Sequence, residues 1–558
     1  MTARILRSPF PDIELAKSDL LSFLISNPYN IDQTAPLFVD ASSSKMYTYR
    51  EVMDRTRSLA HGLRSLGIQA EHNVAIFSPN CIDYPIFCYA ILGCGATVVP
   101  ISAALTAQEL HYQLKSSRAR LLIVHVSLLG AAREAVKDTG VEVILPDRNP
   151  DSLPYHSPNT VEKLIGIYPP SNVVTTPETL LDTQPAFICF SSGTTGPVKG
   201  VMITYSNLTA NLQQWENLFY SQTPYSRTAV AFLPFSHIYA INVYICGALF
   251  RGMTTVILSR FDLDTYMKTI QQYRPQELQL VPPVALQLAK DPRVKNYDMS
   301  SVRSVLSAAA PLSAELASSL EGRFKDEFGT NVYCHQSWGM TETSPLATGL
   351  PPNRMDKRRT VGSIVPNMEL RLVNHETLQD VADQSGHGEM WCRGPNVTRG
   401  YFFNDAANRD TFHVDDDGSR WLRTGDIGSI DEEGFVTIHD RIKEMIKYKG
   451  LQVIPSELEG KLLEHPDIND CGVTSVWNED QATELPIAFV VLKPTAQSDP
   501  PEQVSRRIHE WINTRVASYK RIRGGIKFVH VIPKSSSGKI LRRELRGMLT
   551  PKKSEAKL

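Results

Sequence analysis

The chain has 558 residues, of which 42% are hydrophobic and 21% are charged, and its formal net charge at pH 7 is −1. This length is enough for about three to four ordinary domains, although large α/β units can take up more chain. A net charge so close to zero provides no electrostatic attraction to nucleic acid or to an anionic membrane surface. We therefore expect a globular protein that does not bind nucleic acid.

Cysteine usage and the N-terminal residues both bear on the compartment. The eight cysteines are scattered, with no C-x-x-C pair and no histidines at metal-ligand spacing. This usage indicates a reducing compartment and argues against a structural zinc site. The first twenty residues contain no uninterrupted apolar core, so they do not have the form of a secretory signal.

The stretch 85–105 is apolar enough to raise the question of a transmembrane helix. Gly93, Gly95 and Pro100 interrupt it, and residues 97–99 are β-branched. Such breakers favour a buried helix that turns into a buried strand. We therefore predict that the protein is not an integral membrane protein.

In the first part of the chain, helix and strand patterns alternate. Thr48 and Glu51 have the spacing of a capping box, an apolar helical face follows, and Gly67 is a typical C-terminal stop. Three short apolar runs are typical of strands, at 74–77, 121–124 and 141–145. This alternation favours sheets covered by helices over a β-sandwich.

The sequence changes character near residue 440, where a charged run, 440–444, follows a segment crowded with glycine–aspartate turns. Pro455, Ser456 and Glu459 are predicted to open a capped helix. Beyond them the pattern predicts strands at 472–476, 487–492 and 527–531 and a helix at 502–516. We therefore predict an α/β protein, with a large N-terminal body of helix-covered sheets (1–442) and a small α+β C-terminal domain (443–558).

A loop rich in glycine and hydroxyl groups, SSGTTGPVKG, occupies residues 191–200 and follows an apolar run. Glycines let backbone amides approach an anion, hydroxyls donate hydrogen bonds, and Lys199 neutralises charge, so the loop is typical of a phosphate site. It does not match the Walker A pattern, because Val198 stands at the second glycine and Gly200 at the Ser/Thr position. A P-loop kinase or ATPase is therefore disfavoured.

SSGTTGPVKG resembles the phosphate loop of the adenylate-forming superfamily, which includes acyl-CoA synthetases, coumarate–CoA ligases, luciferases and peptide-synthetase adenylation domains. Further motifs follow in the order of that family: LPFSHIYA (233–240), SAAAPL (307–312), SWGMTET (337–343), RTGD (423–426), DRIKEMIKYKG (440–450) and PKSSSGKILRREL (533–545). LPFSHIYA, KYKGLQV and the closing segment are most similar to aryl- and fatty-acyl-CoA ligases. Motifs in this order over most of the chain argue against a chance match.

The resemblance implies an ATP-dependent acid–thiol ligase that forms an acyl-AMP, releases pyrophosphate and transfers the acyl group to coenzyme A. The acid would be an aryl-alkanoic or cinnamic-type acid, or a medium-chain fatty acid. Both half-reactions need charge stabilisation more than proton transfer, so lysines, Mg²⁺ and amide donors should dominate the site. The alternative is an enzyme that loads a carrier protein instead of coenzyme A, and a catalytically dead relative would be expected to lack Lys539, Glu342 or Asp426.

Nucleotide-binding roles are implied residue by residue. Glu342 would ligate Mg²⁺, Thr341 would touch the α-phosphate, and Trp338 would stack on adenine where relatives usually carry tyrosine. Asp426 would grip the ribose hydroxyls, although a Thr-Gly-Asp sequence is also typical of a turn cap. The remaining nucleotide-site positions are Ser191, Ser192, Gly193, Thr194, Thr195, Gly196, Lys199, Ala309, Gln336, Ser337, Gly339 and Arg441.

In the C-terminal domain the resemblance implies one lysine for each half-reaction. Lys539 would bridge the carboxylate and the α-phosphate during adenylation. The domain would then swing about a hinge at Lys443, which removes Lys539 and presents the face from Lys447 to Gly450 to coenzyme A. Gln452 would approach the nucleotide, and Arg260, in the large body, would lie near the nucleotide of coenzyme A.

The acyl pocket is implied less specifically. Its predicted lining residues are His237, Tyr239, Val243, Ala309, Ser337 and Leu346. His237 would gate the pocket, whereas a lone histidine among apolar residues is more often a satisfied core group. The segment Thr343–Ala347 is one residue shorter than the corresponding segment of plant coumarate ligases, and Ser337 replaces their glycine, which argues against a plain coumarate pocket.

The last three residues, Ala556-Lys557-Leu558, have the small–basic–leucine form of a peroxisomal address. We therefore expect recognition by the peroxisomal import receptor and a peroxisomal location, with the cytoplasm as the alternative. No carrier domain follows the ligase motifs in this sequence.

Overall fold

A computed structural model describes residues 5–146, 160–191, 198–220, 228–381, 386–449, 451–481, 483–535 and 538–549. The chain divides into a large unit (Arg7–Glu369 and Cys392–Leu422) and a small unit (Met1–Leu6, Leu370–Trp391 and Arg423–Leu558). The mixed α/β class, with a large body and a smaller C-terminal part, is confirmed. The small unit takes in segments before residue 443, and the boundary at Lys443 stays a prediction.

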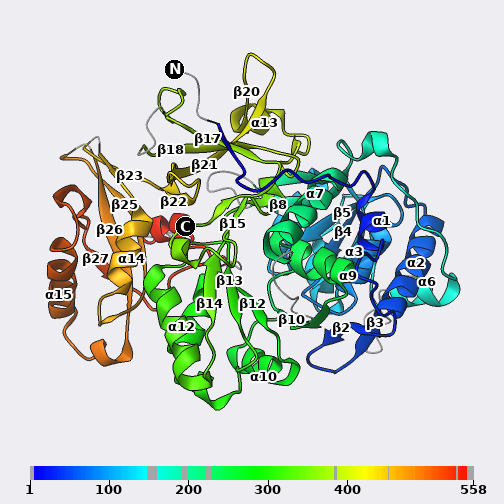
Figure 1. The fold of residues 1–558 in the computed structure, drawn as a ribbon, viewed down its shortest axis with the longest axis horizontal. Helices are drawn as coiled ribbons and strands as arrows, with labels where there is room; N and C mark the ends of the chain where they lie inside the picture. The colour runs from blue at the N-terminus through cyan, green and yellow to red at the C-terminus, as the bar shows by residue number, and fades with distance from the viewer. Residues whose placement is uncertain are drawn as a thin grey trace, which may run out of the picture. The chain divides into compact units, whose positions relative to one another are not determined.

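A seven-stranded sheet runs through the large unit in the order β19-β9-β8-β5-β4-β6-β7. Its strands β8, β5 and β4 are labelled in Figure 1. Its strands are β4 (Asn73–Phe77), β5 (Thr97–Ile101), β6 (Ala119–Val124), β7 (Glu142–Ile144), β8 (Pro185–Ser191), β9 (Lys199–Thr204) and β19 (Gly400–Tyr401). Strands β8, β5, β4, β6 and β7 pair in parallel, whereas β9 is antiparallel to both β8 and β19. The strands predicted at 74–77, 121–124 and 141–145 are confirmed as β4, β6 and β7.

The helix predicted after Thr48 is confirmed as α2 (Tyr49–Ser65). Thr48 Oγ1 accepts a hydrogen bond from the Glu51 amide at 3.2 Å, and the Glu51 carboxylate accepts one from the Thr48 amide at 2.7 Å. This reciprocal pair is the predicted capping box. Gly67 follows the helix with φ of +83°, a left-handed conformation that favours glycine.

The apolar stretch 85–105 contains α3 (Tyr84–Leu92) and β5, and every residue of both elements is buried. The helix has 9 residues, whereas a membrane-spanning helix needs about 20. Within the described ranges, no helix is long and apolar enough to cross a membrane. The prediction of a buried helix turning into a buried strand is therefore confirmed.

Two further sheets of the large unit position site residues. One has the order β10 (Thr228–Ala231), β11 (Thr254–Ile257), β2 (Pro36–Asp40), β3 (Met46–Thr48), and the other the parallel order β12 (Glu277–Leu280), β13 (Ser304–Ser307), β14 (Tyr333–Gln336). Because parallel strands end at one edge of a sheet, the segments after β13 and β14 start side by side. A short pair, β15 (Thr348–Gly349) and β16 (Ser363–Ile364), follows, as does the hairpin of β20 (Phe412–Val414) with β21 (Arg420–Ile430).

The remaining helices of the large unit lie between these strands along the chain. They are α1 (Leu20–Leu24), α4 (Ala107–Ser116), α5 (Leu129–Ala135), α6 (Val161–Ile167), α7 (Tyr205–Trp215), α8 (Ile238–Ala240), α9 (Gly247–Arg251), α10 (Leu263–Tyr273), α11 (Pro282–Lys290), α12 (Ala314–Phe328) and α13 (Asp405–Thr411). Helices α4 and α5 supply Leu110, Leu114 and Ala132 to a buried cluster with β4, β5 and β6. These helices therefore cover one face of the seven-stranded sheet.

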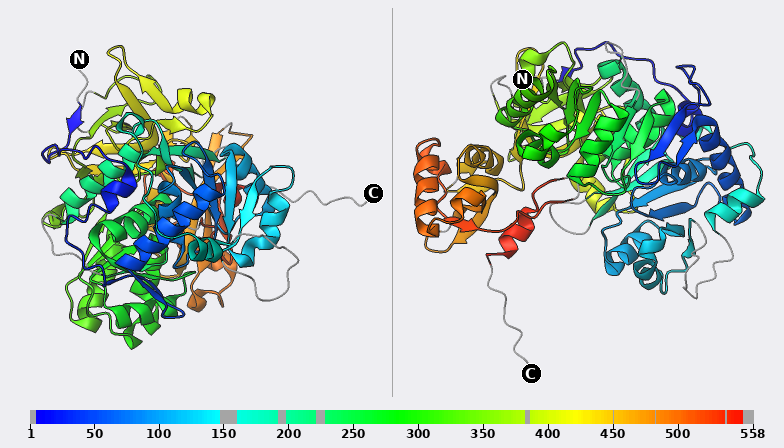
Figure 2. Two further views of the ribbon diagram at one scale, coloured as in Figure 1. Left: turned by 90° about the vertical axis from the view of Figure 1, so that its right-hand side faces the viewer. Right: turned by 90° about the horizontal axis from the view of Figure 1, so that it is seen from below.

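In the small unit, a sheet of β25 (Ile468–Asn478), β26 (Thr483–Leu492) and β27 (Ile526–Phe528) lies between helices (Figure 2). Helices α14 (Pro455–Leu463) and α15 (Pro501–Asn513) pack against Ala488 and Val490, and α16 (Arg542–Gly547) packs against Ile487 and Phe489. Alternate residues of β26 thus face opposite layers. The predicted strands and the helix at 502–516 are confirmed, although β27 ends at Phe528.

A further sheet, most of whose strands lie wholly or partly in the small unit, carries the RTGD motif and the start of the DRIKE motif. Strands β17 (Glu369–Val373), β18 (Gly388–Arg393), β21 and β22 (Val436–Arg441) are neighbours in that order, with β1 (Leu6–Arg7) beside β17. The hairpin β23 (Ile446–Tyr448) and β24 (Leu451–Val453) follows.

The capped start predicted for α14 is wrong, although the helix forms. Its N-cap residue, Ile454, makes no side-chain cap, and Pro455 occupies the first turn. Glu459 does not reach back to the helix start, because its carboxylate accepts hydrogen bonds from the Val473 amide at 2.8 Å and from Arg542. Tertiary partners have therefore taken the carboxylate that the local pattern assigned to the cap.

Candidate active site

The ends of the predicted phosphate loop are held together by strands β8 and β9. Ser191 and Lys199 are register partners in this antiparallel pair. The Lys199 ammonium lies 4.8 Å from the centre of the Tyr401 ring, a distance at which the ring face attracts a cation. Loop residues 192–197, which include Ser192, Gly193, Thr194, Thr195 and Gly196, lie outside the described residues.

Glu342, the predicted Mg²⁺ ligand, is a buried carboxylate with 5% exposure. The Tyr401 hydroxyl donates a hydrogen bond to Glu342 Oε1 at 2.8 Å, and the Glu342 carbonyl accepts one from the Thr398 amide at 2.8 Å. Burial, together with the nearby Glu342 charge, raises the pKa of Tyr401, so this phenol stays protonated and able to donate. One tyrosine therefore contacts both the lysine that ends the loop and the carboxylate.

The residues around Glu342 fit a Mg²⁺ ion that is held jointly with a substrate. Among the residues that the structure describes, no group of three or more His, Cys, Asp or Glu side chains could hold a metal ion by itself. Mg²⁺ is typically bound through one or two carboxylates plus substrate phosphates and water. The Glu342 carboxylate, oriented at Oε1 by Tyr401, is the type of ligand that such an ion takes.

The SWGMTET segment folds as a tight loop after β14. The Trp338 amide donates to Thr348 Oγ1 at 3.1 Å, and the Met340 amide donates to the Pro345 carbonyl at 3.0 Å. A β-carbon at Gly339 would lie 1.9 Å from the Pro345 carbonyl oxygen, so no other residue fits without moving the backbone. Thr341 is half-buried in a short 3-10 helix, Thr341–Thr343.

Buried side-chain amides hold the other side of this loop. Asn396 Nδ2 donates to the carbonyls of Thr343 at 2.9 Å and Leu346 at 2.8 Å. Asn211 brackets Leu346, since its Nδ2 donates to the Leu346 carbonyl at 2.8 Å and its Oδ1 accepts from the Leu346 amide at 3.2 Å. Asn242 in turn donates to Asn211 Oδ1 at 3.1 Å. These groups satisfy backbone atoms that no strand or helix pairs.

The segment after β13 lies at the same edge of its sheet as the SWGMTET loop. Ala309 has φ of +72°, which is uncommon for a residue with a β-carbon and costs backbone energy. Gln336 Oε1 accepts a hydrogen bond from the Leu312 amide at 2.7 Å, and therefore ties this segment to the end of β14. In this structure the Gln336 side chain supports the loop, and its predicted contact with nucleotide stays a prediction.

The predicted acyl-pocket residues have unequal burial. Tyr239, Val243, Ser337 and Leu346 are buried, as is Trp338 beside them in the sequence. Ala309, by contrast, is exposed.

His237 caps helix α8. Its Nδ1 atom accepts a hydrogen bond from the Tyr239 amide at 3.3 Å. Burial lowers the pKa of His237, so its ring is neutral at pH 7. Arg260 is exposed and lies two residues before Asp262. Its predicted place near the nucleotide of coenzyme A stays a prediction.

In the small unit, the RTGD motif is part of strand β21, not a turn cap. Asp426 is opposite Arg441 in the β21–β22 register, and Arg441 Nε lies 2.8 Å from Asp426 Oδ1. Thr424 Oγ1 accepts from the Asp426 amide at 3.1 Å and donates to the Met390 carbonyl at 2.7 Å. The carboxylate predicted to bind ribose is thus fixed, with 3% exposure, beside a guanidinium.

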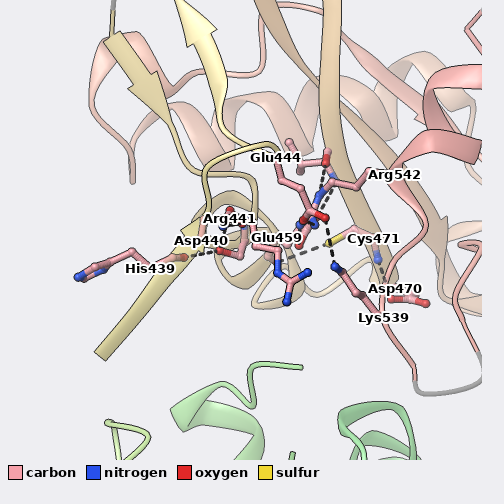
Figure 3. Close-up of polar contacts among 11 residues, drawn as sticks. His439, Asp440, Arg441, Glu444, Glu459, Asp470, Cys471, Lys539 and Arg542 are labelled. Atoms are coloured by element: carbon pink, nitrogen blue, oxygen red, sulfur yellow. Dashed lines mark hydrogen bonds and ion pairs between the residues drawn. The ribbon is translucent and has the colours of Figure 1, made fainter. Parts of the chain in front are cut away.

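Lys539 lies in a small loop that its own backbone closes. The Ser535 amide donates to the Lys539 carbonyl at 2.8 Å, and the Lys539 amide donates to Ser535 Oγ at 3.1 Å. The Lys539 ammonium lies 3.4 Å from Glu444 Oε1 (Figure 3). Burial and Arg441 lower the pKa of Lys539, while Glu444 and Asp426 act in the opposite direction. The small unit therefore gathers Asp426, Arg441 and Lys539 within electrostatic range of each other.

The predicted hinge and thiol-binding residues are on the surface of the small unit. The side chains of Lys443 and Lys447 are exposed. The hairpin that carries Lys447 is fastened to β26, because its amide donates to Glu484 Oε2 at 2.7 Å and its carbonyl accepts from Thr483 Oγ1 at 2.9 Å. The backbone of Gln452 is opposite Lys447, whereas Gly450 and the Gln452 side chain lie outside the described residues.

Tyr401, Asn211, Asn396, Glu444 and Arg542 were not identified from the sequence. The first three act through contacts with segments between 50 and 135 positions away. Glu444 stands inside a recognised motif, but its spacing does not show that it faces Lys539. Sequence signals for these partners are weak. Tyr401 follows a glycine and Asn396 follows a proline, as is typical of any loop, and Asn211 is a polar residue within helix α7.

A family model described as AMP-binding enzyme matches residues 29–402, and one described as AMP-binding enzyme C-terminal domain matches residues 457–539. The 4-coumarate–CoA ligase 2 of Petroselinum crispum is 34% identical over 560 residues, which cover 98% of this chain and 97% of that protein. The peroxisomal OPC-8:0-CoA ligase 1 of Arabidopsis thaliana is 34% identical over 545 residues, which cover 97% and 94%.

Solved structures share the fold. The ATP-bound MatB from Rhodopseudomonas palustris superposes with a TM-score of 0.82 at 23% identity, over 95% of this chain and 98% of that one. The anthranilate CoA ligase AuaEII, in complex with anthranoyl-AMP, superposes with a TM-score of 0.81 at 24% identity, over 95% and 97%.

Gly339→Ala tests the tight loop. Because the added β-carbon would meet a backbone oxygen, we expect the free energy of unfolding of the large unit to fall by about 1–3 kcal/mol, seen as a lower thermal midpoint. Gly322→Ala in helix α12 is the matched control, since a β-carbon there has nothing within 4 Å. Equal midpoints for the two variants would contradict the close approach at Gly339.

Proposed function

The chain belongs to the AMP-binding enzyme family, and from its site residues we propose that it is an ATP-dependent acid–thiol ligase. In the first half-reaction a carboxylate oxygen attacks the α-phosphorus of ATP, which forms the acyl-adenylate and releases pyrophosphate. In the second, the thiol of coenzyme A attacks the acyl carbon, which forms the thioester and releases AMP and a proton.

One observation carries this proposal: Tyr401 contacts both Lys199 and Glu342. Lys199 ends a loop of glycines and hydroxyls, and Glu342 is a buried carboxylate suited to Mg²⁺. A nucleoside triphosphate needs both a fixed cation and a carboxylate-held divalent ion, because its charge must be neutralised as the α-phosphorus is attacked. When bound, Mg²⁺ would supply that neutralisation.

Further roles on the large unit follow from position. We assign the β- and γ-phosphates to the 191–199 loop and the α-phosphate to Thr341, which lies next to Glu342. The indole of Trp338 and the strained segment at Ala309 are assigned to the adenine. This assignment is supported by their positions, because the two segments follow the neighbouring parallel strands β14 and β13 at the same edge of the sheet. The tight loop would keep these groups in place without reorganisation during the reaction.

The small unit contributes the remaining charges. Asp426 is assigned to the ribose hydroxyls, because a carboxylate accepts from a diol through two oxygens. Lys539 is assigned to the carboxylate and α-phosphate oxygens in adenylation, and Lys447 to the thioester step. An exchange of these lysines needs movement of the domain that carries them, which we assign to the exposed hinge at Lys443.

For the acid, we propose an aryl-alkanoic or cinnamic-type acid, or a medium-chain fatty acid. The relatives named above are a 4-coumarate–CoA ligase and an OPC-8:0-CoA ligase, so similar chains act on different acids. The neutral His237, buried Tyr239, Val243 and Leu346 would offer an apolar wall without a charge to pair a second carboxylate. His237 is assigned to gating this pocket.

We also propose import into the peroxisome through Ala556-Lys557-Leu558, which lies outside the described residues. The form of this tripeptide and the peroxisomal name of one relative support the proposal. A fluorescent fusion with and without the three residues tests it, and an unchanged diffuse distribution would contradict it.

The function is tested by pyrophosphate release from ATP and Mg²⁺ over a panel of acids, with and without coenzyme A. The panel contains cinnamic, phenylacetic, and short-, medium- and long-chain acids. We expect steady turnover with one class, faster with coenzyme A and coupled to thioester formation. A stoichiometric burst that coenzyme A does not accelerate would instead favour transfer to a carrier protein.

Lys539→Ala separates the half-reactions. We expect acid-dependent pyrophosphate release to fall at least about a hundredfold, because an adenylation-specific charge is lost, while thioester formation from supplied acyl-AMP persists. Lys534→Ala is the matched control, because Lys534 lies in the same segment as Lys539 but forms its ion pair with Asp470. Unchanged pyrophosphate release in Lys539→Ala would refute the assigned role.

Tyr401→Phe tests the support of Glu342. Without the phenolic hydrogen bond the carboxylate is less well oriented, so we expect a raised Mg²⁺ requirement and about a threefold to tenfold lower adenylation efficiency. Tyr47→Phe removes a similar tyrosine–carboxylate bond, to Asp83 at 2.9 Å, and is the control. Identical Mg²⁺ titrations for Tyr401→Phe and the unaltered enzyme would contradict the assignment.

A further inference from the structure

Glu444 is the centre of a buried ionic cluster in the small unit (Figure 3). Its side chain is 6% exposed, and that of Arg542 is 8% exposed. The two form a direct ion pair. A carboxylate removed from water in this way is retained in a fold when cations and hydrogen bonds compensate for its lost hydration.

The Arg542 side of the cluster is rigid. Arg542 Nη2 donates to both oxygens of Glu459, at 2.9 and 2.8 Å, and its Nε donates to the Val473 carbonyl at 3.0 Å. Nη2 contacts Glu459, Nε contacts Val473 and Nη1 contacts Glu444, so each guanidinium nitrogen has a partner and the orientation of the group is fixed. Because Glu459 belongs to α14 and Val473 to β25, Glu444 is anchored to the core of the small unit through Arg542.

The other side of the cluster is Lys539. Glu444 uses Oε2 for Arg542 and Oε1 for Lys539, so each oxygen has its own cation. The Lys539 side chain is 26% exposed, which makes it the more accessible end of this chain of charges. An ammonium has three N–H donors, and contact with Glu444 engages one of them. Among the residues that the structure describes, Glu444 is the ion-pair partner of this ammonium. Two donors are then available, the number needed to bridge an acyl carboxylate and an α-phosphate.

Other charged groups face the same ammonium. Arg441 opposes its protonation, whereas Glu444 and Asp426 favour it. Burial of Glu444 disfavours its charged form and by itself would raise its pKa. The positive charges of Arg542, Lys539 and Arg441 outweigh this effect, so the pKa of Glu444 is lowered. Glu444 therefore remains ionised at neutral pH and can keep Lys539 charged and directed.

We propose that Glu444 is the positioning residue for Lys539, which it holds charged with two donors turned outward for the adenylation step. The inference rests on the proposed function of Lys539. It extends that function by assigning to Glu444 a chemical task in one half-reaction, in addition to its place in a motif.

Glu444→Gln removes the charge with little change of shape. Without the Glu444 charge, only Asp426 still counteracts the pKa-lowering effect of burial and Arg441, so we expect the pKa of Lys539 to fall. Since the protonated amine is the active form, we expect the alkaline limb of the adenylation rate to move to lower pH by roughly one unit. At a pH above both limbs, adenylation should fall by about tenfold relative to thioester formation from supplied acyl-AMP.

Two variants control for a merely structural effect. Glu444→Asp keeps the charge for Arg542 but shortens the reach to Lys539, so we expect slower adenylation with an unmoved alkaline limb. It also serves if Glu444→Gln does not fold, since a buried Arg542 keeps an anionic partner. Asp470→Asn removes a different carboxylate, which pairs with Lys534 at 2.7 Å in the same unit, and should leave the pH profile unchanged.

The outcomes separate this inference from the proposed function. If Lys539→Ala abolishes adenylation while both Glu444 variants adenylate at the normal rate with a normal pH profile, the positioning role is wrong and the function stands. If Lys539→Ala adenylates normally, the assigned role of Lys539 fails first. Equal slowing of both half-reactions in the Glu444 variants, with an unmoved limb in Glu444→Gln, would also overturn the inference.

Discussion

The large unit depends on one buried carboxylate. Glu342 is nearly inaccessible to water, and an ionised group in that position is tolerated only with partners. Tyr401 supplies a hydroxyl, and the same ring lies against Lys199. Because Tyr401 pairs with Val201 through β19 and β9, the sheet itself brings Lys199, at the end of the predicted phosphate loop, to the carboxylate. Strand pairing and side-chain contacts therefore both fix the position of Tyr401 between Lys199 and Glu342.

In both units, irregular segments are held in place by side chains from elements that are distant in the sequence. Asn211 and Asn396 satisfy backbone atoms of the loop after Glu342, which no strand or helix could pair. In the small unit, Arg542 connects Glu444 to the core and leaves Lys539 at the accessible end. Rigid support for reacting groups reduces the reorganisation needed when charge develops.

Local patterns predicted several elements of each unit, because the information for these elements is local. The capping box at Thr48, the buried helix and strand within 85–105, and the six other predicted strands follow from residues a few positions apart. The failure at α14 has the opposite cause. Glu459 has cap spacing from the helix start, but Arg542, 83 positions away, competes for its carboxylate and offers a two-point contact.

The sequence by itself determined the family motifs, their order and the residue types that phosphate, Mg²⁺ and ribose chemistry require. Only the tertiary structure decided which side chains hold them: Tyr401 at Glu342, Arg441 at Asp426 and Glu444 at Lys539. The physical reason is range. A motif records a short stretch of chain, whereas a buried charge is stabilised by whatever the fold brings within about 3–4 Å, regardless of separation along the sequence.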